Sequence, residues 1–260
     1  MILILFKKDC LLFAKEKPDS YYELIIADPP YNDCIKAEWD NQWKDDNEYL
    51  NWLEVRIKEF SRILKPNGNL LMYCKRQFSH HIKIILDQYL YERRMIIWVR
   101  RRNMDITRGK TLASGYEPIL WYSKSDQFIF NSKEAKIKPP KRLLQRPEYQ
   151  KGGRLEKGIS LTDAWTDIPA LPHNSKEKTE HPTQKPLKIS KRIVKIFSTP
   201  SGTVYIPFAG SGSEVLACIF LNRKWDATEI NPTYINLIKK RLKNCPTSIE
   251  RWLPIKEKIS

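Results

Sequence analysis

The sequence predicts an α/β protein, in which helices cover a mostly parallel sheet. Short apolar runs alternate along the 260 residues with segments in which apolar side chains recur every three or four positions. Hydrophobic residues make up 41% of the chain, which is enough to bury a sizeable core. The length therefore fits one large α/β domain or such a domain with an insertion.

The expected strands are seven short apolar runs, at residues 3–6, 23–27, 69–74, 95–99, 118–122, 203–206 and 225–228. The clearest helix spans residues 46–64, where apolar side chains at steps of three and four share one face. Pro66 cannot continue this helix, and Gly68 suits the turn that would follow it. Further helices are expected at residues 79–90, 186–197, 213–221 and 232–244.

One segment has neither helix nor strand periodicity. Residues 133–157 carry nine basic residues against three acids, together with three prolines and two glycines. We interpret 131–180 as a basic insertion outside the sheet, ordered only in part without its partner. The chain then divides into residues 1–130, the insertion 131–180 and residues 181–260.

Charge and cysteine content narrow the class of protein. Lys and Arg number 46 against 30 Asp and Glu, a net charge of +16 that favours a polyanionic partner, nucleic acid before an acidic membrane. The five cysteines form no C-x-x-C pair, so we expect free thiols in a reducing cytoplasm and no metal site. The leading "MILILFKK" has the wrong order for a signal peptide, and no run reaches the ~20 apolar residues of a membrane span. We expect a soluble cytoplasmic protein.

The first chemical motif is "DPPY" at residues 28–31, within "YYELIIADPPYND". An apolar strand ends at Asp28 and is followed by two prolines, which lack the N–H that a central strand needs. A turn at the end of a strand accounts for this pattern structurally. A rigid acid, proline pair and aromatic at a strand end also suit the binding of a planar ring that carries an amine.

The second motif lies in "VYIPFAGSGSEVLACIFLNRKWDATEIN", residues 204–231. A strand leads into a loop with Gly210 and Gly212, then a helix, then a strand that ends at Glu229. The glycines allow a tight turn close to a ligand, and an acid at the next strand end commonly binds ribose hydroxyls. Neither the full dinucleotide fingerprint nor a phosphate loop is present, so a ligand with a ribose and no phosphate fits best.

Together, "DPPY" and "PFAGSG" (207–212) resemble the amino-group DNA methyltransferases that use S-adenosylmethionine. Four more segments agree in order, and they are "DC" (9–10), "RILKPNGNLLMY" (62–73), "EPILWYSK" (117–124) and "HPTQKP" (181–186). The catalytic motif precedes the cofactor loop, which is the permuted order of the β class. The resemblance implies a Rossmann-like class I methyltransferase sheet, mostly parallel with one antiparallel edge strand, and an inserted basic target-recognition region.

The resemblance also implies the chemistry of Asp28, Pro29, Pro30 and Tyr31. The Asp28 carboxylate and the Pro29 carbonyl would accept the hydrogens of an exocyclic amine, which frees its lone pair to attack the methyl group in line. Tyr31 would stack on the ring, and the prolines would fix the geometry at little entropic cost. A base inside a duplex cannot reach such a motif, so it must be flipped out.

The cofactor contacts implied by the resemblance come from four parts of the chain. They are Asp9 and Cys10 at the adenine, Thr183, Lys185 and Asp28 at the methionine, the loop Phe208, Ala209, Gly210, Ser211 and Gly212, and Glu229 at the ribose, followed by Asn231. A helix cap and a buried thiol explain Asp9 and Cys10 equally well. We expect His181 to be structural. One departure stands out, because most relatives have an acid where this chain has Ile206.

Two basic groups are candidates for DNA contact. Arg100, Arg101 and Arg102 follow the strand 95–99, although a solvated strand end would explain them as well. Lys141, Arg142 and Arg146 lie in the insertion, where this class places its target-recognition region. Such contacts to phosphate give affinity, whereas contacts to base edges give sequence preference.

The sequence thus predicts methylation of adenine N6 in double-stranded DNA, since Asp at the first motif position is more usual in adenine-directed relatives. Methylation of cytosine N4 is the main alternative, and a DNA-binding protein with a decayed cofactor site is an alternative of another class. Methylation of RNA or of a protein glutamine fits less well. A homodimer and a cognate restriction endonuclease are candidate partners.

Overall fold

The computed structural model describes residues 4–32, 35–100, 112–139, 143, 145 and 158–245. They build an eight-stranded sheet in the order β1-β10-β9-β2-β3-β5-β4-β8. In that order, the strands are Ile4–Lys7, Lys224–Glu229, Thr203–Ile206, Tyr22–Ala27, Leu64–Tyr73, Tyr116–Ser123, Tyr91–Val99 and Ala164–Trp165. The seven predicted strands are all present, although β3 and β4 begin earlier than predicted.

The sheet is mostly parallel, as predicted, but its antiparallel strand is not at the edge. Strands β1, β10, β9, β2 and β3 all pair in parallel. Strand β5 runs antiparallel to both of its neighbours, β3 and β4, and β8 adds to β4 in parallel. Strand β5 therefore lies between β3 and β4, and β4 lies one position nearer the edge of the sheet than β5. The amino end of β5 therefore lies at the edge where the parallel strands end.

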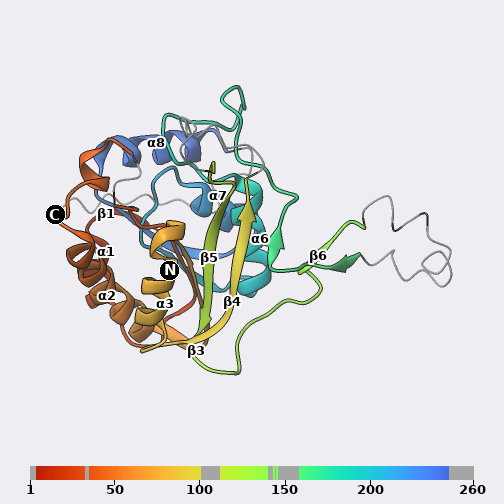
Figure 1. The fold of residues 1–260 in the computed structure, drawn as a ribbon, viewed down its shortest axis with the longest axis horizontal. Coiled ribbons are helices and arrows are strands. Elements are labelled where there is room, and N and C mark those ends of the chain that lie inside the picture. The colour runs from red at the N-terminus through yellow and green to blue at the C-terminus, as the bar shows by residue number, and fades with distance from the viewer. Residues whose placement is uncertain are drawn as a thin grey trace.

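Helices cover the sheet on both faces (Figure 1). One face carries α1 (Cys10–Lys15), α2 (Asp46–Ile63) and α3 (Ser79–Leu86), and the other carries α6 (Leu187–Phe197), α7 (Ser213–Phe220) and α8 (Pro232–Lys243). Side chains alternate along β2, so Leu24 and Ile26 pack in one core while Ile25 and Ala27 pack in the other. Two short 3₁₀ helices, Glu38–Asp40 and Arg76–Phe78, lie in the connections.

Two local expectations differ from the structure. Pro66 and Gly68 do not form a turn but lie inside β3, where the pairing with β2 shifts from Tyr22↔Leu64 to Leu24↔Asn69. The irregular register accommodates the proline. In addition, α1 has no counterpart among the predicted helices, because six residues are too few to show a helical period.

The segment 131–180 lies partly in the main sheet. Strands β6 (Lys136–Ile137) and β7 (Ile159–Ser160) form a separate antiparallel pair, and β6 projects from the body in Figure 1. Strand β8, however, pairs with β4 through Ile97↔Ala164 and Trp98↔Trp165, and Trp165 is buried. The expectation that this segment stays outside the sheet is therefore wrong at β8, where a buried tryptophan anchors the chain. In the described ranges, no helix combines the length and apolar character needed to cross a membrane.

Candidate active site

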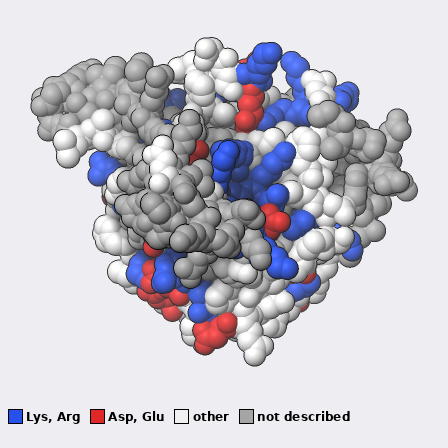
Figure 2. All heavy atoms as spheres, turned by 90° about the vertical axis from the view of Figure 1, so that its right-hand side faces the viewer, with Lys and Arg blue, Asp and Glu red and all other residues white. Residues whose placement is uncertain are grey.

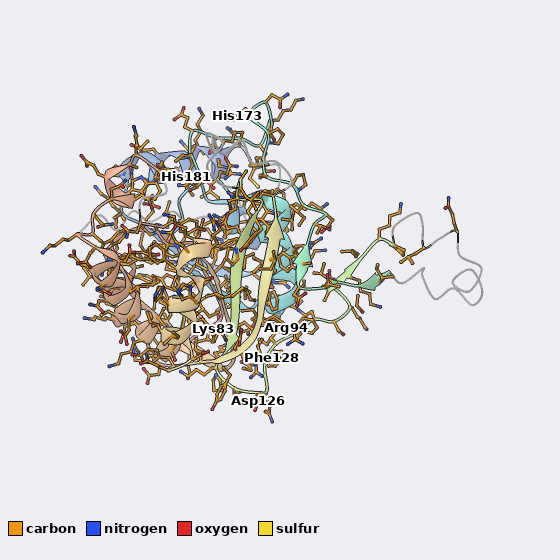
Figure 3. The ribbon with its side chains drawn as sticks, in the orientation of Figure 1. Lys83, Arg94, Asp126, Phe128, His173 and His181 are labelled. Carbon is orange, nitrogen blue, oxygen red and sulfur yellow. The ribbon has the colours of Figure 1, made fainter. Side chains whose placement is uncertain are left out.

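A pocket of about 210 Å³ opens at the edge where the parallel strands end. Its walls come from the segments that follow β1, β2, β9 and β10, and from the segment that precedes α6. This is the edge at which open α/β sheets bind ligands. Figure 3 places His181 there, at the opposite end of the sheet from Asp126 and Phe128.

The pocket brings together most of the predicted site residues. Those lining it are Asp9, Cys10, Asp28, Pro30, Thr183, Lys185, Phe208, Ala209, Gly210, Ser211, Glu229 and Asn231. Three predicted residues are not in its wall: Pro29, Tyr31 and Gly212. Arg100 follows β4 at the same edge, whereas Arg101, Arg102, Lys141, Arg142 and Arg146 lie outside the described residues.

Asp28 is held by a buried cluster of side chains. Lys185 Nζ lies 2.9 Å from Asp28 Oδ1, 2.8 Å from Asp28 Oδ2 and 2.9 Å from Glu117 Oε1. Burial alone would lower the pKa of Lys185, but the two carboxylates outweigh it and raise the pKa above its usual value. Lys185 is therefore a cation that balances two acids.

Tyr31 completes this cluster through its hydroxyl. The hydroxyl oxygen lies 2.7 Å from Asp28 Oδ1 and 2.5 Å from Glu117 Oε1. Burial, followed by the charges of Asp28 and Glu117, raises the pKa of Tyr31 well above its ordinary value, so it stays a hydrogen-bond donor. The residue as a whole is 9% exposed. Stacking of Tyr31 on a target base would thus require its ring to come out of the core.

Glu229 is held by the backbone. Its Oε2 accepts a hydrogen bond of 2.8 Å from Gly210 N, and its Oε1 accepts one of 2.8 Å from Asn231 N. Burial raises the pKa of Glu229, while these backbone N–H groups act against the rise. The carboxylate is thus fixed at the end of β10, facing the glycine loop.

Both loop glycines are required by geometry. Gly210 has φ +47°, and a side chain there would begin 2.9 Å from His181 Nε2. Gly212 has φ +78° at the start of α7, and a side chain there would begin 3.0 Å from Ile238 on α8. Gly210 therefore shapes the pocket, whereas Gly212 allows α7 to pack close to α8.

Asp9 is both a helix cap and part of the pocket wall. Its Oδ1 accepts from Leu11 N at 2.9 Å, and its Oδ2 lies 2.9 Å from Arg56 Nη2. Arg56 in turn lies over the Trp52 ring, 3.8 Å from its centroid. Burial raises the pKa of the neighbouring Cys10 to about 12, against the lowering effect of Arg56, so its thiol stays protonated. The structural and functional interpretations of Asp9 are therefore compatible.

Several lining residues were missed by the sequence analysis. They include Trp39, Gln42, Trp52, Arg56, Glu214 and Tyr234, which join His181 in the pocket wall. The His181 ring lies 4.4 Å from Tyr234 and 6.2 Å from Trp39, measured between ring centroids. Burial, followed by the charge of Lys185, lowers the pKa of His181 to about 3. One signal was available, because Glu214 is an acid within the otherwise apolar helix "SEVLACIF".

The described residues hold no group of three or more His, Cys, Asp or Glu side chains arranged to bind a metal ion.

Comparison with known sequences identifies a family. The profile of a family described as DNA methylase matches residues 22–240. The type II methyltransferase M.BamHI of Bacillus amyloliquefaciens is 30% identical over 247 residues, covering 92% of this chain and 57% of that protein. The DNA adenine methyltransferase YhdJ of Escherichia coli (strain K12) is 31% identical over 244 residues, covering 90% of this chain and 80% of that protein. The chain thus spans little more than half the length of M.BamHI.

Solved structures share the fold. The M1.HpyAVI–SAM complex has a TM-score of 0.65 at 25% identity, covering 93% of this chain and 99% of that one. The cytosine-N4-specific PvuII DNA methyltransferase has a TM-score of 0.73 at 17% identity, covering 95% of this chain and 88% of that one. At this identity the likeness concerns the fold alone. These neighbours confirm the predicted Rossmann-like sheet.

Proposed function

The chain belongs to the family of DNA methylases, and we propose that it transfers the methyl group of S-adenosylmethionine to the exocyclic N6 amine of adenine in double-stranded DNA. The observation that carries this proposal is the continuity of the pocket. Asp28 and Pro30 line it together with Gly210, Ser211 and Glu229, so one cavity holds both sequence motifs. A methyl donor in the glycine loop would therefore lie beside the acid that receives the amine.

The residues present fit S-adenosylmethionine. Gly210 leaves its backbone open to the pocket, and the half-buried Glu229 carboxylate suits a pair of ribose hydroxyls. Thr183 and Lys185 would face the methionine part, and Asp9 and Cys10 the adenine. When bound, this cofactor supplies an electrophilic methyl group on sulfur.

Asp28 would act on the target amine as a hydrogen-bond acceptor. A carboxylate can accept about four hydrogen bonds, so Asp28 keeps capacity beside its contacts with Lys185 and Tyr31. Together with the Pro29 carbonyl, it would hold both amine hydrogens and free the nitrogen lone pair for in-line attack. Asp28 would then accept the proton that the amine loses. The buried side chains of Lys185 and Tyr31 hold Asp28 in place, so little reorganisation is needed at the moment of transfer.

Adenine is the proposed base for two reasons. The first motif opens with Asp28, and the relative at 31% identity is named as an adenine methyltransferase. Cytosine N4 is the second candidate, because the PvuII enzyme shares the fold. A decayed cofactor site is less favoured, since the pocket retains the glycine loop and Glu229.

DNA contacts are proposed on charge and position. Figure 2 shows a group of Lys and Arg side chains at the centre of one face of the molecule. Arg100 follows β4 at the edge that carries the pocket, and we propose that Arg101, Arg102 and the insertion residues Lys141, Arg142 and Arg146 join it in binding phosphates. The segment 131–180 would supply target recognition. We also propose that the protein forms a homodimer, acts together with a cognate restriction endonuclease and is located with the cell's DNA.

The test is methyl transfer from labelled S-adenosylmethionine to mixed-sequence duplex DNA, followed by digestion to nucleosides. Label in N6-methyladenine is the expected result. Label in N4-methylcytosine would move the proposal to its second candidate. No label, with DNA binding retained, would favour the decayed site.

Asp28→Ala provides the matching variant. We expect transfer to fall by about 10²- to 10³-fold, because loss of one positioned hydrogen-bonding group at a reacting centre raises the barrier by roughly 3–4 kcal/mol. DNA binding should be retained, and Lys185 would keep Glu117 as its partner, so the fold should survive. The control is Asp126→Ala, whose side chain is 87% exposed at the far end of the sheet (Figure 3). Retained transfer in Asp28→Ala would exclude the acceptor role.

A further inference from the structure

Glu214 is a buried acid for which the proposed chemistry has no use. It is the second residue of α7, its side chain lines the pocket and the residue is 5% exposed. Carboxylates are seldom buried unless a cation or several hydrogen bonds compensate for lost hydration. Its position in the wall therefore needs an explanation.

Other charged side chains in the pocket wall have partners. Asp9 pairs with Arg56, Asp28 pairs with Lys185, and Lys8 pairs with Glu16. Glu229 accepts two backbone N–H groups instead. Their charges are thus compensated within the protein.

Glu214 differs from all of these. Its Oε1 accepts a hydrogen bond of 2.8 Å from Ser190, and in the part of the chain that the structure describes it makes no ion pair. Burial, followed by the nearby charge of Asp28, raises the pKa of Glu214. Because the Glu214 carboxylate has no cationic partner among the described residues, it would stabilise a cation that enters the pocket more than acids that already have such a partner.

This chain differs at position 206 from the amino-group methyltransferases that it resembles, because it has an isoleucine there in place of an acid. Ile206 ends β9 and is fully buried in the apolar cluster that contains Ile189 and Val215. Ile189 directly precedes Ser190 in the chain, and Val215 directly follows Glu214. The acid expected at position 206 is thus replaced by a core isoleucine, while an unpaired acid lies on the adjoining helix.

We propose that Glu214 binds the ammonium group of the cofactor's methionine part, in place of the missing acid at position 206. The inference rests on the proposed function and assigns one contact within it. Asp28 is less suited to this contact, because both of its oxygens already lie within 2.9 Å of Lys185 Nζ. Glu214 would then be a binding residue that makes up for the departure at Ile206.

Binding calorimetry tests this assignment without catalysis. Three ligands are compared: S-adenosylmethionine, its decarboxylated form, which keeps the ammonium, and 5′-methylthioadenosine, which has neither ammonium nor carboxylate. In Glu214→Gln, we expect affinity for the first two to fall by roughly 10- to 100-fold, as for loss of a charged hydrogen bond. Affinity for 5′-methylthioadenosine should be unchanged. Glu214→Asp keeps the charge and should bind better than Glu214→Gln.

Glu134→Gln is the control, since Glu134 forms a half-exposed pair with Lys195 outside the pocket. Its affinities should equal those of the unmodified protein. Unchanged binding of S-adenosylmethionine in Glu214→Gln, or an equal loss for all three ligands, would overturn the assignment. An unmodified protein that does not bind S-adenosylmethionine saturably would overturn the proposed function itself.

Discussion

Two acids of the pocket wall, Asp28 after β2 and Glu229 at the end of β10, two strands away in the sheet, are held in different ways. Asp28 is held by the side chains of Lys185 and Tyr31, which contact it directly. Both of these side chains also contact Glu117. These residues come from the ends of β2 and β5 and from the segment before α6. Glu229 is held by the backbone N–H groups of Gly210 and Asn231.

The difference determines what each acid depends on. A carboxylate bound by backbone N–H groups keeps its partners when nearby side chains change, provided that the backbone path is kept. A carboxylate bound by a buried lysine loses its compensation when that one side chain is removed. We therefore expect the Asp28 end to be sensitive to side-chain identity and the Glu229 end to backbone conformation.

The largest effect is expected from Lys185→Met. This variant leaves the buried Glu117 and the part-buried Asp28 without their cation, and breaking such a group costs about 3–5 kcal/mol of unfolding free energy. Urea unfolding measures the loss. Lys195→Met is the control, because Lys195 forms a half-exposed pair with Glu134 that should contribute less than about 1 kcal/mol. If both variants lost the same small amount, the Asp28 end would not depend on its side chains.

Much of the fold was predictable because its elements are short and regular. Apolar runs marked the strands, and the three- and four-residue steps of α2 marked its buried face from Leu53 to Phe60. The place of β5 in the sheet was not predictable in this way, since periodicity carries no information on strand order. Strand β8 was missed because only two residues pair, and its anchor is the single buried side chain of Trp165.

The candidate site was predicted where adjacent residues define it. The glycine loop and the acid after β10 can be recognised along the chain, and the structure brings Gly210 and Glu229 into contact. The cluster at Asp28 could be predicted only in part. Glu117 lies 89 residues and Lys185 157 residues after Asp28 in the sequence. Their pairing depends on β5 running antiparallel.

Gly210→Ala tests the backbone end of the comparison. The methyl group would require a left-handed conformation and would begin 2.9 Å from His181 Nε2, so we expect a loss of about 2 kcal/mol in unfolding free energy. Affinity for S-adenosylmethionine should also fall, because the N–H that orients Glu229 would move. Gly115→Ala is the control, since a side chain there would meet nothing within 4 Å. An equally mild effect of both variants would mean that Glu229 does not depend on the loop backbone.

The smallest effect concerns His181, which packs against Gly210 and lies near Lys185, and so connects the two ends. Its pKa is about 3 in the folded protein and about 6.5 in the unfolded chain. Between pH 3 and pH 6.5 the unfolded chain therefore binds a proton at this residue more readily than the folded protein does. Stability from this residue is therefore complete above pH 6.5 and is lost as the pH falls toward 3, by about 1.4 kcal/mol at pH 5.5. Urea unfolding at pH 8 and pH 5.5 should show this loss in the unmodified protein and in His173→Asn, an exposed control at the same edge (Figure 3). His181→Asn should lose about 1.4 kcal/mol less unfolding free energy over the same pH interval. A pH response equal to that of the unmodified protein would contradict this prediction. It would show that His181 is accessible to protons and is not a buried neutral ring between the two acids.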